Sequence, residues 1–251
     1  VVLAGKKSKV PVIIHESDMT PGLANKIAIP SASKVCCNFP ETLDCLPEGK
    51  AVLTGSPIRQ ELLSGNKIAA MDMCGFTAEK PVILVIGGSL GSVIVNNAVR
   101  EALPELLNKF QVIHLCGKGK TDESLNGTKG YCQFEYIKNE LRDIFALADI
   151  VISRAGANAI CELLALRKPN LLIPLSAKAS RGDQILNARS FERQGFSMVI
   201  EEENLSKESL LQAVQNLYDN RSTFMDAMRN SGQQDSIDTI IGLIEEAADH
   251  N

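Results

Sequence analysis

Several short polar segments of the sequence carry residues that could do chemistry, and the first is rich in glycine and serine. Gly-Gly-Ser-Leu-Gly-Ser at residues 87–92 follows an apolar run at 82–86 and precedes a helical pattern. Where a strand turns directly into a helix, free N–H groups and the positive end of the helix dipole point at one spot, which suits a phosphate. The segment is neither the dinucleotide fingerprint nor a P-loop. The alternative is an ordinary turn whose glycines only relieve strain.

A second strand-to-helix turn carries Ser-Arg-Ala-Gly-Ala-Asn at residues 153–158, with Glu162 on the first turns of the helix that follows. A carboxylate there can accept two hydrogen bonds from a vicinal diol such as a ribose. Alone, Glu162 fits equally a solvated helix residue near the positive end of the dipole. Together with the glycine-rich segment, it predicts a nucleotide held between two turns.

Two further segments offer polar groups at expected strand ends. Asp183, Gln184 and Asn187 open a helix and suit sugar hydroxyls, although Asp183 also fits a plain N-cap with polar neighbours. His15 and Glu16 end the first apolar run. His15 fits a general base or a structural histidine at a strand end.

Nothing in the sequence indicates a metal site. The three histidines are far apart, and His114 and His250 have no polar constellation around them. The cysteines lack zinc spacing, and the sequence has no nucleophile elbow. We therefore expect neither a metal nor another cofactor.

The elements that must position these residues are short apolar runs alternating with helical patterns, which is typical of βαβ units and a parallel sheet. The predicted strands are residues 10–14, 34–38, 51–54, 82–86, 110–116, 132–136, 150–153, 170–174 and 198–200. The predicted helices are residues 23–29, 58–63, 67–74, 93–103, 139–148, 159–166, 183–194, 206–219, 221–230 and 235–249. Residues 82–200 thus form one doubly wound domain, and the part before Gly55 forms the second half of another.

Composition narrows the class of protein. The 251 residues are 45% hydrophobic and 22% charged, which excludes a disordered, collagen-like or coiled-coil chain. The net charge of −4 argues against a nonspecific nucleic-acid binder. The seven cysteines are interpreted as reduced thiols of a cytosolic protein. Glycine, serine and asparagine interrupt the uncharged stretch at 81–99, so no spanning helix is expected there, while peripheral attachment stays open.

The ordered set of motifs resembles the MurG family of glycosyltransferases. The resemblance rests on Ile-His-Glu at 14–16, Gly-Ser-Pro-Ile-Arg at 55–59, the segments at 87–92 and 153–156, and then Glu162, Gln184 and Asn187 in order. That family makes peptidoglycan for the cell wall. Its members move N-acetylglucosamine from a UDP donor onto undecaprenyl-pyrophosphoryl-N-acetylmuramoyl-pentapeptide (lipid I), forming lipid II.

The resemblance implies an α/β chain with the GT-B fold, which has two Rossmann-like doubly wound domains, the N-terminal one incomplete here. It divides the chain into residues 1–56 on the acceptor side and 57–234 on the donor side. A last helix at 235–251 either returns to the N-terminal domain or packs within its own. It further implies an inverting hexosyltransferase that works as a peripheral protein on the cytoplasmic side of the plasma membrane.

The resemblance also assigns donor contacts. Gly88, Ser89, Gly91 and Arg59 would meet the diphosphate, with Arg59 as a positive partner for departing UDP. Ala157 and Asn158 would offer backbone N–H groups, Glu162 would hold the ribose, and Ile137 would meet the uracil through its backbone. Asp183, Gln184 and Asn187 would hold the sugar. Asn25 matches the family pattern near His15 and Glu16, the two candidate catalytic residues.

Two departures from the family pattern bear on activity. Ser17 and Asp18 stand where the family commonly has Gln and Asn. The glycine-rich loop and histidine with which the family begins do not precede His15 here, so we expect donor contacts without the acceptor half and weak or no turnover by the isolated chain. Two alternatives stay open, namely a UDP-sugar 2-epimerase of GT-B fold and a non-catalytic fragment.

Overall fold

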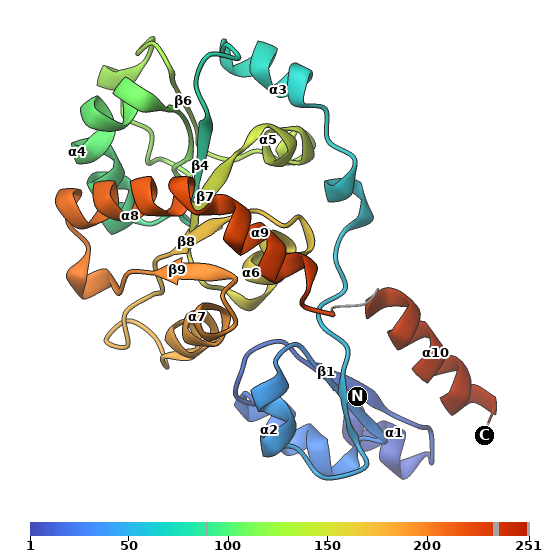
Figure 1. The fold of residues 1–251 in the computed structure, drawn as a ribbon. Helices are drawn as coiled ribbons and strands as arrows, with labels where there is room; N and C mark the ends of the chain where they lie inside the picture. The colour runs from blue at the N-terminus through green and yellow to red at the C-terminus, as the bar shows by residue number, and fades with distance from the viewer. Residues whose placement is uncertain (89, 233–235, 250–251) are drawn as a thin grey trace. The chain divides into compact units, whose positions relative to one another are not determined.

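The chain folds into two compact units. A computed structural model describes residues 1–88, 90–232 and 236–249. Unit 1 comprises Val1–Ile58 together with Ser231–Asn251, and unit 2 comprises Arg59–Asn230. Each unit is a parallel sheet with helices packed on it, which confirms the predicted α/β class (Figure 1).

Unit 2 is built on a six-stranded parallel sheet of order β6-β5-β4-β7-β8-β9. Its strands are β4 (Val82–Ile86), β5 (Gln111–Leu115), β6 (Tyr131–Phe134), β7 (Ile150–Ser153), β8 (Asn170–Leu172) and β9 (Ser197–Val199). From β4 the chain moves outward through β5 to β6, and β7 then returns to the other side of β4. This is the doubly wound order, and the strand order reverses between β4 and β7.

Helices cover both faces of this sheet, as its strongly buried strands require (Figure 1). They are α3 (Lys67–Cys74), α4 (Val93–Lys109), α5 (Leu141–Leu147), α6 (Ala157–Ala165), α7 (Asp183–Arg193), α8 (Lys207–Asp219) and α9 (Arg221–Arg229). Short 3₁₀ turns are η3 (Gln60–Leu63), η4 (Glu123–Leu125) and η5 (Glu202–Asn204). Val99 of α4 and Leu210 of α8 share one core cluster with Ile83 and Val85 of β4.

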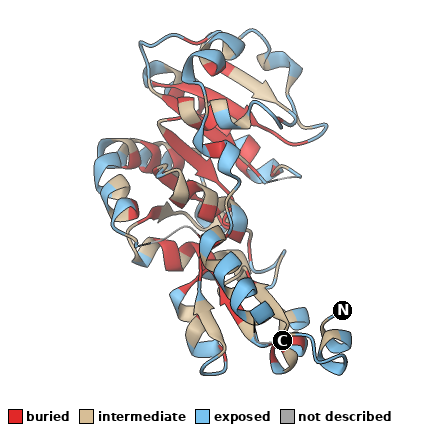
Figure 2. Ribbon diagram, turned by 90° about the vertical axis from the view of Figure 1, so that its right-hand side faces the viewer, coloured by how far each residue is buried: buried red, intermediate tan, exposed pale blue. Residues whose placement is uncertain are grey.

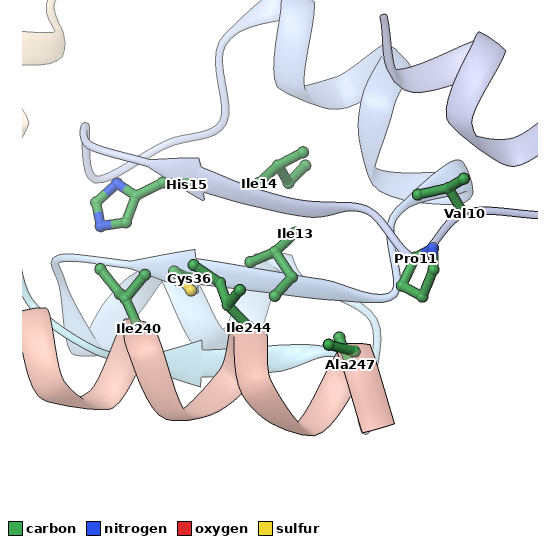
Figure 3. A pocket seen from close by; sticks show the side chains of 10 residues that line it. Val10, Pro11, Ile13, Ile14, His15, Cys36, Ile240, Ile244 and Ala247 are labelled. Atoms are coloured by element: carbon green, nitrogen blue, oxygen red, sulfur yellow. The ribbon is translucent and has the colours of Figure 1, made fainter. Parts of the chain in front are cut away.

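Unit 1 holds a smaller parallel sheet of order β1-β2-β3. Its elements are α1 (Val2–Lys7), β1 (Ile13–Glu16), α2 (Leu23–Ala28), η1 (Ile29–Ser31), β2 (Lys34–Cys37), η2 (Pro40–Cys45), β3 (Ala51–Leu53) and α10 (Ser236–Asp249). The Ser236 hydroxyl donates to the Ser56 carbonyl across 2.7 Å. Figure 3 shows Ile240 and Ile244 of α10 turned toward the sheet, where they line a cavity of about 510 Å³ with residues of β1.

Burial is concentrated on the strands of unit 2. Figure 2 shows the buried residues gathered along that sheet, whereas the core of unit 1 is small. The buried cluster of unit 1 consists of Ile29, Ala32, Val35, Cys37 and Leu46. In the described part of the chain, no helix is both long and apolar enough to cross a bilayer.

Three predicted elements differ most from the structure in their extent or type. β1 begins at Ile13 rather than at residue 10, because Pro11 has no N–H to give to a sheet ladder. α4 continues to Lys109 through Pro104, where packing on the sheet outweighs the lost hydrogen bond. The segment predicted as a helix at 58–63 is a 3₁₀ turn over Gln60–Leu63.

Candidate functional site

The carboxyl ends of β4 and β7 form the switch point of the larger sheet. The two strands are neighbours, with Ile86 opposite Ser153, and each leads through a short turn into a helix, α4 or α6. In open α/β sheets ligands bind in the crevice at such a point. Two helix starts therefore offer N–H donors and partial positive charge to one place.

In the glycine loop, defined as residues 87–92, the individual glycines are needed for different structural reasons. Gly88 and Gly91 both have left-handed backbones, with φ of 88° and 68°. A Cβ on Gly91 would lie 2.0 Å from the carbonyl oxygen of Cys116, so packing against the end of β5 requires glycine there. A Cβ on Gly88 would meet nothing closer than 3.9 Å, so this side of the loop is open to a ligand. Ser89, expected at the diphosphate, lies outside the described residues.

A buried arginine, Arg154, lies beneath the glycine loop and connects it to the neighbouring turns. Its guanidinium donates to the carbonyls of Ile173 and Pro174 at 3.0 and 3.1 Å and to the Ser92 hydroxyl at 2.6 Å. It also forms an ion pair with Glu202. Arg154 belongs to the motif at 153–158, but the motif alone predicts no role for this arginine. The available signal was its place at the end of an apolar strand, because a buried guanidinium must find several acceptors.

Arg59 and Glu162, both predicted to contact the donor, lie against each other. Arg59 Nε and Nη2 donate to Glu162 Oε1 at 3.2 and 3.0 Å. The Arg59 side chain is 47% exposed and that of Glu162 is 19% exposed. Both bonds end on one carboxylate oxygen, which leaves Oε2 for another donor. The pair places a positive and a negative group side by side near the start of α6.

The start of α6 is free of side-chain capping. Its N-cap is Gly156, which makes no side-chain hydrogen bond, so the first N–H groups of the helix, including those of Ala157 and Asn158, are available to an anion. Asn158 is exposed and Ala157 is buried. Ile137, expected at the uracil, is buried just after β6.

The three predicted sugar ligands near α7 have distinct surroundings. Asp183 forms an ion pair with Arg181 at 2.8 Å. Gln184 Oε1 accepts from the Leu175 N–H at 3.0 Å, which leaves its NH₂ group as the donor for a ligand. Asn187 is fully buried and donates to the Ala155 carbonyl at 3.3 Å, so it ties α7 to the turn before α6.

Within unit 1, His15, Glu16 and Asn25 cluster at the end of β1. The Glu16 carboxylate accepts hydrogen bonds from the loop after it, including the Gly22 N–H at 2.9 Å and Asn25 Nδ2 at 2.8 Å. Glu16 and Asn25 therefore order this loop. His15 Nε2 donates to the Gly55 carbonyl at 3.0 Å, which leaves Nδ1 as the acceptor of the neutral ring.

The expectation that His114 has no polar constellation around it is wrong, because a buried polar network surrounds its ring. His114 Nε2 donates to Asn96 Oδ1, and Nδ1 accepts from the Tyr131 hydroxyl, both at 3.0 Å. Asn96 in turn donates to the Cys116 carbonyl at 2.9 Å, next to the glycine loop. Burial, reinforced by the positive charge of Arg100, lowers the pKa of His114 to about 3. The polar partners lie on α4 and β6, so no local pattern could reveal them.

The chain is similar to known proteins over most of its length. Residues 82–240 match the glycosyltransferase family 28 C-terminal domain. The chain is 70% identical over 246 residues to a protein of Lachnoclostridium phytofermentans, covering 98% of this chain and 69% of the relative. That relative is named UDP-N-acetylglucosamine–N-acetylmuramyl-(pentapeptide) pyrophosphoryl-undecaprenol N-acetylglucosamine transferase. A Lachnospira eligens protein of the same name is 69% identical, covering 98% of this chain and 70% of the relative.

The chain belongs to the MurG family of glycosyltransferases. The crystal structure of Acinetobacter baumannii MurG superposes with a TM-score of 0.76 at 24% identity, covering 98% of this chain and 69% of that one. This likeness confirms the predicted GT-B fold.

A putative UDP-N-acetylglucosamine 2-epimerase from Listeria monocytogenes also superposes, with a TM-score of 0.70 and 12% identity, over 100% of this chain and 71% of that one. At that identity the likeness concerns the fold alone. Membership of the MurG family therefore favours the transferase over the epimerase alternative.

Proposed function

We propose that this chain is an inverting N-acetylglucosaminyltransferase that moves the sugar of UDP-N-acetylglucosamine onto undecaprenyl-pyrophosphoryl-N-acetylmuramyl-pentapeptide, forming lipid II. One observation carries the proposal: the glycine loop and the uncapped start of α6 flank the switch point of a single sheet, with Glu162 on α6 beside them. In this proposal, unit 2 is the donor-binding domain.

The diphosphate is held by backbone groups. The N–H groups at the start of α6, and those at the start of α4 other than the Val95 N–H that the Ser92 hydroxyl caps, face an anion without needing a metal, and the open side of Gly88 admits it. Negative charge on the diphosphate grows as the bond to the sugar breaks. Fixed N–H donors and a nearby guanidinium stabilise this charge best when they are already in place.

In the proposed complex the Arg59–Glu162 ion pair separates, and each residue binds a different part of the donor. Glu162 accepts hydrogen bonds from the two ribose hydroxyls, and Arg59 turns from the carboxylate to the diphosphate. The exchange replaces an exposed ion pair, which contributes little free energy, with two contacts to the ligand. Ile137 offers its backbone to the uracil.

The side chains proposed to contact the sugar and the acceptor differ in which hydrogen-bonding groups they have free. Gln184 presents its NH₂ group to the sugar, and Asp183 is the second candidate. Inversion requires a base that takes the proton from the attacking acceptor hydroxyl. Of His15, Glu16 and Asn25, His15 keeps a free ring nitrogen, Nδ1, and is the candidate that fits this task.

Because the acceptor is anchored in lipid, we propose that the protein works as a peripheral protein at the cytoplasmic face of the plasma membrane. Leu3, Leu23 and Ile27 of unit 1 are 64%, 70% and 60% exposed, and Lys6 and Lys26 share their helices. Apolar and basic side chains together suit an anionic bilayer surface. Co-sedimentation with anionic vesicles should exceed that with neutral ones, and equal pelleting would contradict this attachment.

The first test of the donor site is calorimetric titration with UDP and UDP-N-acetylglucosamine, with ADP as the control nucleotide. We expect saturable binding that is selective for uridine. Glu162→Ala should weaken UDP binding by about 10–100-fold, because hydrogen bonds from the ribose to a charged group are lost. Glu105→Ala is the matched control, since Glu105 forms a comparable ion pair with Lys207 away from the switch point.

Two results would contradict the proposal. A folded chain that does not bind UDP would leave the family membership without a working donor site. Equal UDP affinity in Glu162→Ala and the wild type would remove the ribose role of Glu162. Incubation with UDP-N-acetylglucosamine alone separates the remaining alternative, because an epimerase converts its sugar without any acceptor.

A further inference from the structure

A lysine outside the predicted site, Lys120, forms hydrogen bonds with the glycine loop. Its Nζ donates to the carbonyl of Leu90 at 2.6 Å and to that of Gly91 at 3.1 Å. Lys120 lies in the turn after β5, about thirty residues further along the chain, and is half-buried. One ammonium therefore binds two successive carbonyls of the loop proposed to hold the diphosphate.

The backbone of Lys120 is itself fixed. Arg100 of α4 donates to the Lys120 carbonyl at 2.5 Å, and the Lys120 N–H donates to the Gly117 carbonyl at 3.1 Å. Gly117 packs so tightly on the glycine loop that a Cβ there would lie 2.5 Å from the Leu90 carbonyl oxygen. Lys120 thus reaches the loop from a rigid base rather than from a loose surface turn.

This contact fixes the direction of a peptide group. A trans peptide is planar, with its C=O and N–H on opposite sides. In the peptide between Gly91 and Ser92 the carbonyl faces Lys120, so the N–H of Ser92 faces the other way. Ser92 is also held through its hydroxyl by Arg154. Both cations bind oxygen atoms of the loop. Because the Gly91 N–H already donates to the Gly88 carbonyl at 3.0 Å, the Ser92 N–H is the group that this orientation leaves to an anion.

The charge of Lys120 is not neutralised by a close carboxylate. Among the ion pairs of the described residues none includes Lys120, whereas Arg154 is paired with Glu202. An ammonium has three donors, and two carbonyls use two of them. Lys120 therefore contributes net positive charge behind the loop, where it attracts a dianionic group more strongly than a neutral one.

We propose that Lys120 is a positioning residue of the donor site, which holds the glycine loop in its anion-binding conformation and supplies the unpaired positive charge behind it. The inference rests on the proposed function, because it takes the glycine loop as the seat of the diphosphate. It assigns to Lys120 part of the discrimination between a nucleoside diphosphate and the free nucleoside.

The test is calorimetric titration of the whole chain with UDP, UMP and uridine. Lys120→Met should weaken UDP binding about tenfold and UMP binding less, while uridine affinity stays within twofold of the wild type. Lys120→Arg, which keeps both the charge and several donors, should recover most of the UDP affinity. Lys118→Met is the matched control, because Lys118 is exposed in the same turn and should leave all three affinities unchanged.

A second variant separates the two contributions of Lys120 and guards against loss of folding. Lys120→Gln keeps donors but removes the charge, so it should lie between Lys120→Met and the wild type and should reduce the salt dependence of UDP binding. Thermal melts check that each variant is folded. If Lys120→Met does not fold, the comparison of Lys120→Gln and Lys120→Arg decides.

The outcomes distinguish this inference from the function on which it rests. Absence of UDP binding by the wild type would overturn the proposed function. Wild-type UDP binding that both Lys120→Met and Lys120→Gln retain in full would overturn the role of Lys120 alone. Equal losses for UDP and uridine would also overturn it, because they would show a general structural contribution rather than a selective one.

Discussion

At the scale of residues, the Arg59–Glu162 pair joins two groups that serve different parts of one ligand. Replacing Arg59 by Met frees Glu162 Oε1 from both of its bonds. We expect Arg59→Met to bind uridine about two- to threefold more tightly, since the carboxylate no longer has to leave an exposed partner. The same variant should bind UDP about tenfold more weakly, because a cation near the diphosphate is lost.

Arg59→Met is expected to change the uridine affinity and the UDP affinity in opposite directions, which a general loss of structure would not do. Calorimetry on Arg59→Met with uridine and with UDP measures both affinities on the same preparation. Arg142→Met is a suitable control, because Arg142 is similarly exposed beside Asp143. A fall in both affinities would mean that Arg59 only supports the structure around Glu162.

His114 makes stability depend on pH. Its pKa is about 3 in the folded protein against an ordinary value of 6.5, because burial and then Arg100 oppose the charged ring. Below about pH 6.5 the His114 ring binds a proton in the unfolded chain but stays neutral in the folded chain. The free energy of unfolding therefore falls as the pH falls toward 3. The contribution reaches about 1.4 kcal/mol per pH unit.

Urea unfolding of the wild type and of His114→Gln between about pH 8 and pH 5 measures this contribution. Well above pH 6.5 the ring is neutral in both states, and the stability difference between the two proteins should be constant. Below it the wild type should lose stability more steeply than the variant. Parallel curves would show that the ring is protonated in the folded state.

At the scale of elements, the turn after β4 depends on a close approach between two backbones. Gly91→Ala places a Cβ 2.0 Å from the Cys116 carbonyl oxygen at a φ of 68°, so it should cost roughly 2–4 kcal/mol in unfolding free energy. Gly156→Ala is the control, because a Cβ there meets nothing within 4 Å. Urea unfolding compares them, and equal stability would contradict the close packing.

The sequence predicted the elements of unit 2 well, because β4 and β7 are uninterrupted apolar runs followed by small polar residues. The fold class and the family follow from that pattern and its motifs. α1 was not predicted, since Val2–Lys7 buries no residue and has no apolar period to reveal it. The end of α4 was wrong because Pro104 is a strong local signal that tertiary packing overrides.

The candidate site was predictable only as residue types at turns. Glu162 and Arg59 could be named from their motifs, but their mutual ion pair spans 103 positions and appears only in the folded chain. Lys120 and His114 gave no local signal, because their partners lie on other elements. Sequence patterns indicate periodicity and turns. The contacts that support a loop from other elements, such as those of Lys120, depend instead on the order of the strands in the sheet.

At the scale of the whole molecule, α10 belongs to unit 1, although unit 2 separates it from β1–β3 in the sequence. Ile240 lies against β1 and lines a cavity with Ile13 and Cys36 (Figure 3). Ile240→Asp should destabilise unit 1 by about 1–3 kcal/mol through a half-buried charge and lost apolar contact. Hydrogen exchange should then rise in β1–β3 and stay unchanged in β4–β9, with UDP affinity retained.

Ile241→Asp provides the comparison for this prediction, because Ile241 is 45% exposed on the same helix. It should change exchange in β1–β3 less than Ile240→Asp does. Faster exchange spreading into β4, or loss of UDP binding, would mean that the two units do not unfold independently.

The path of the chain has a consequence for its synthesis. Unit 2 lies in the sequence between the two segments of unit 1, and the bond from Ser236 to Ser56 closes a span of 180 residues. β1–β3 leave the ribosome before unit 2, whereas α10 emerges only after all of unit 2. Domains fold as units during translation, so unit 2 can fold before α10 is available to pack on β1–β3. Nascent chains of this protein therefore carry an uncovered apolar strand face until α10 leaves the ribosome.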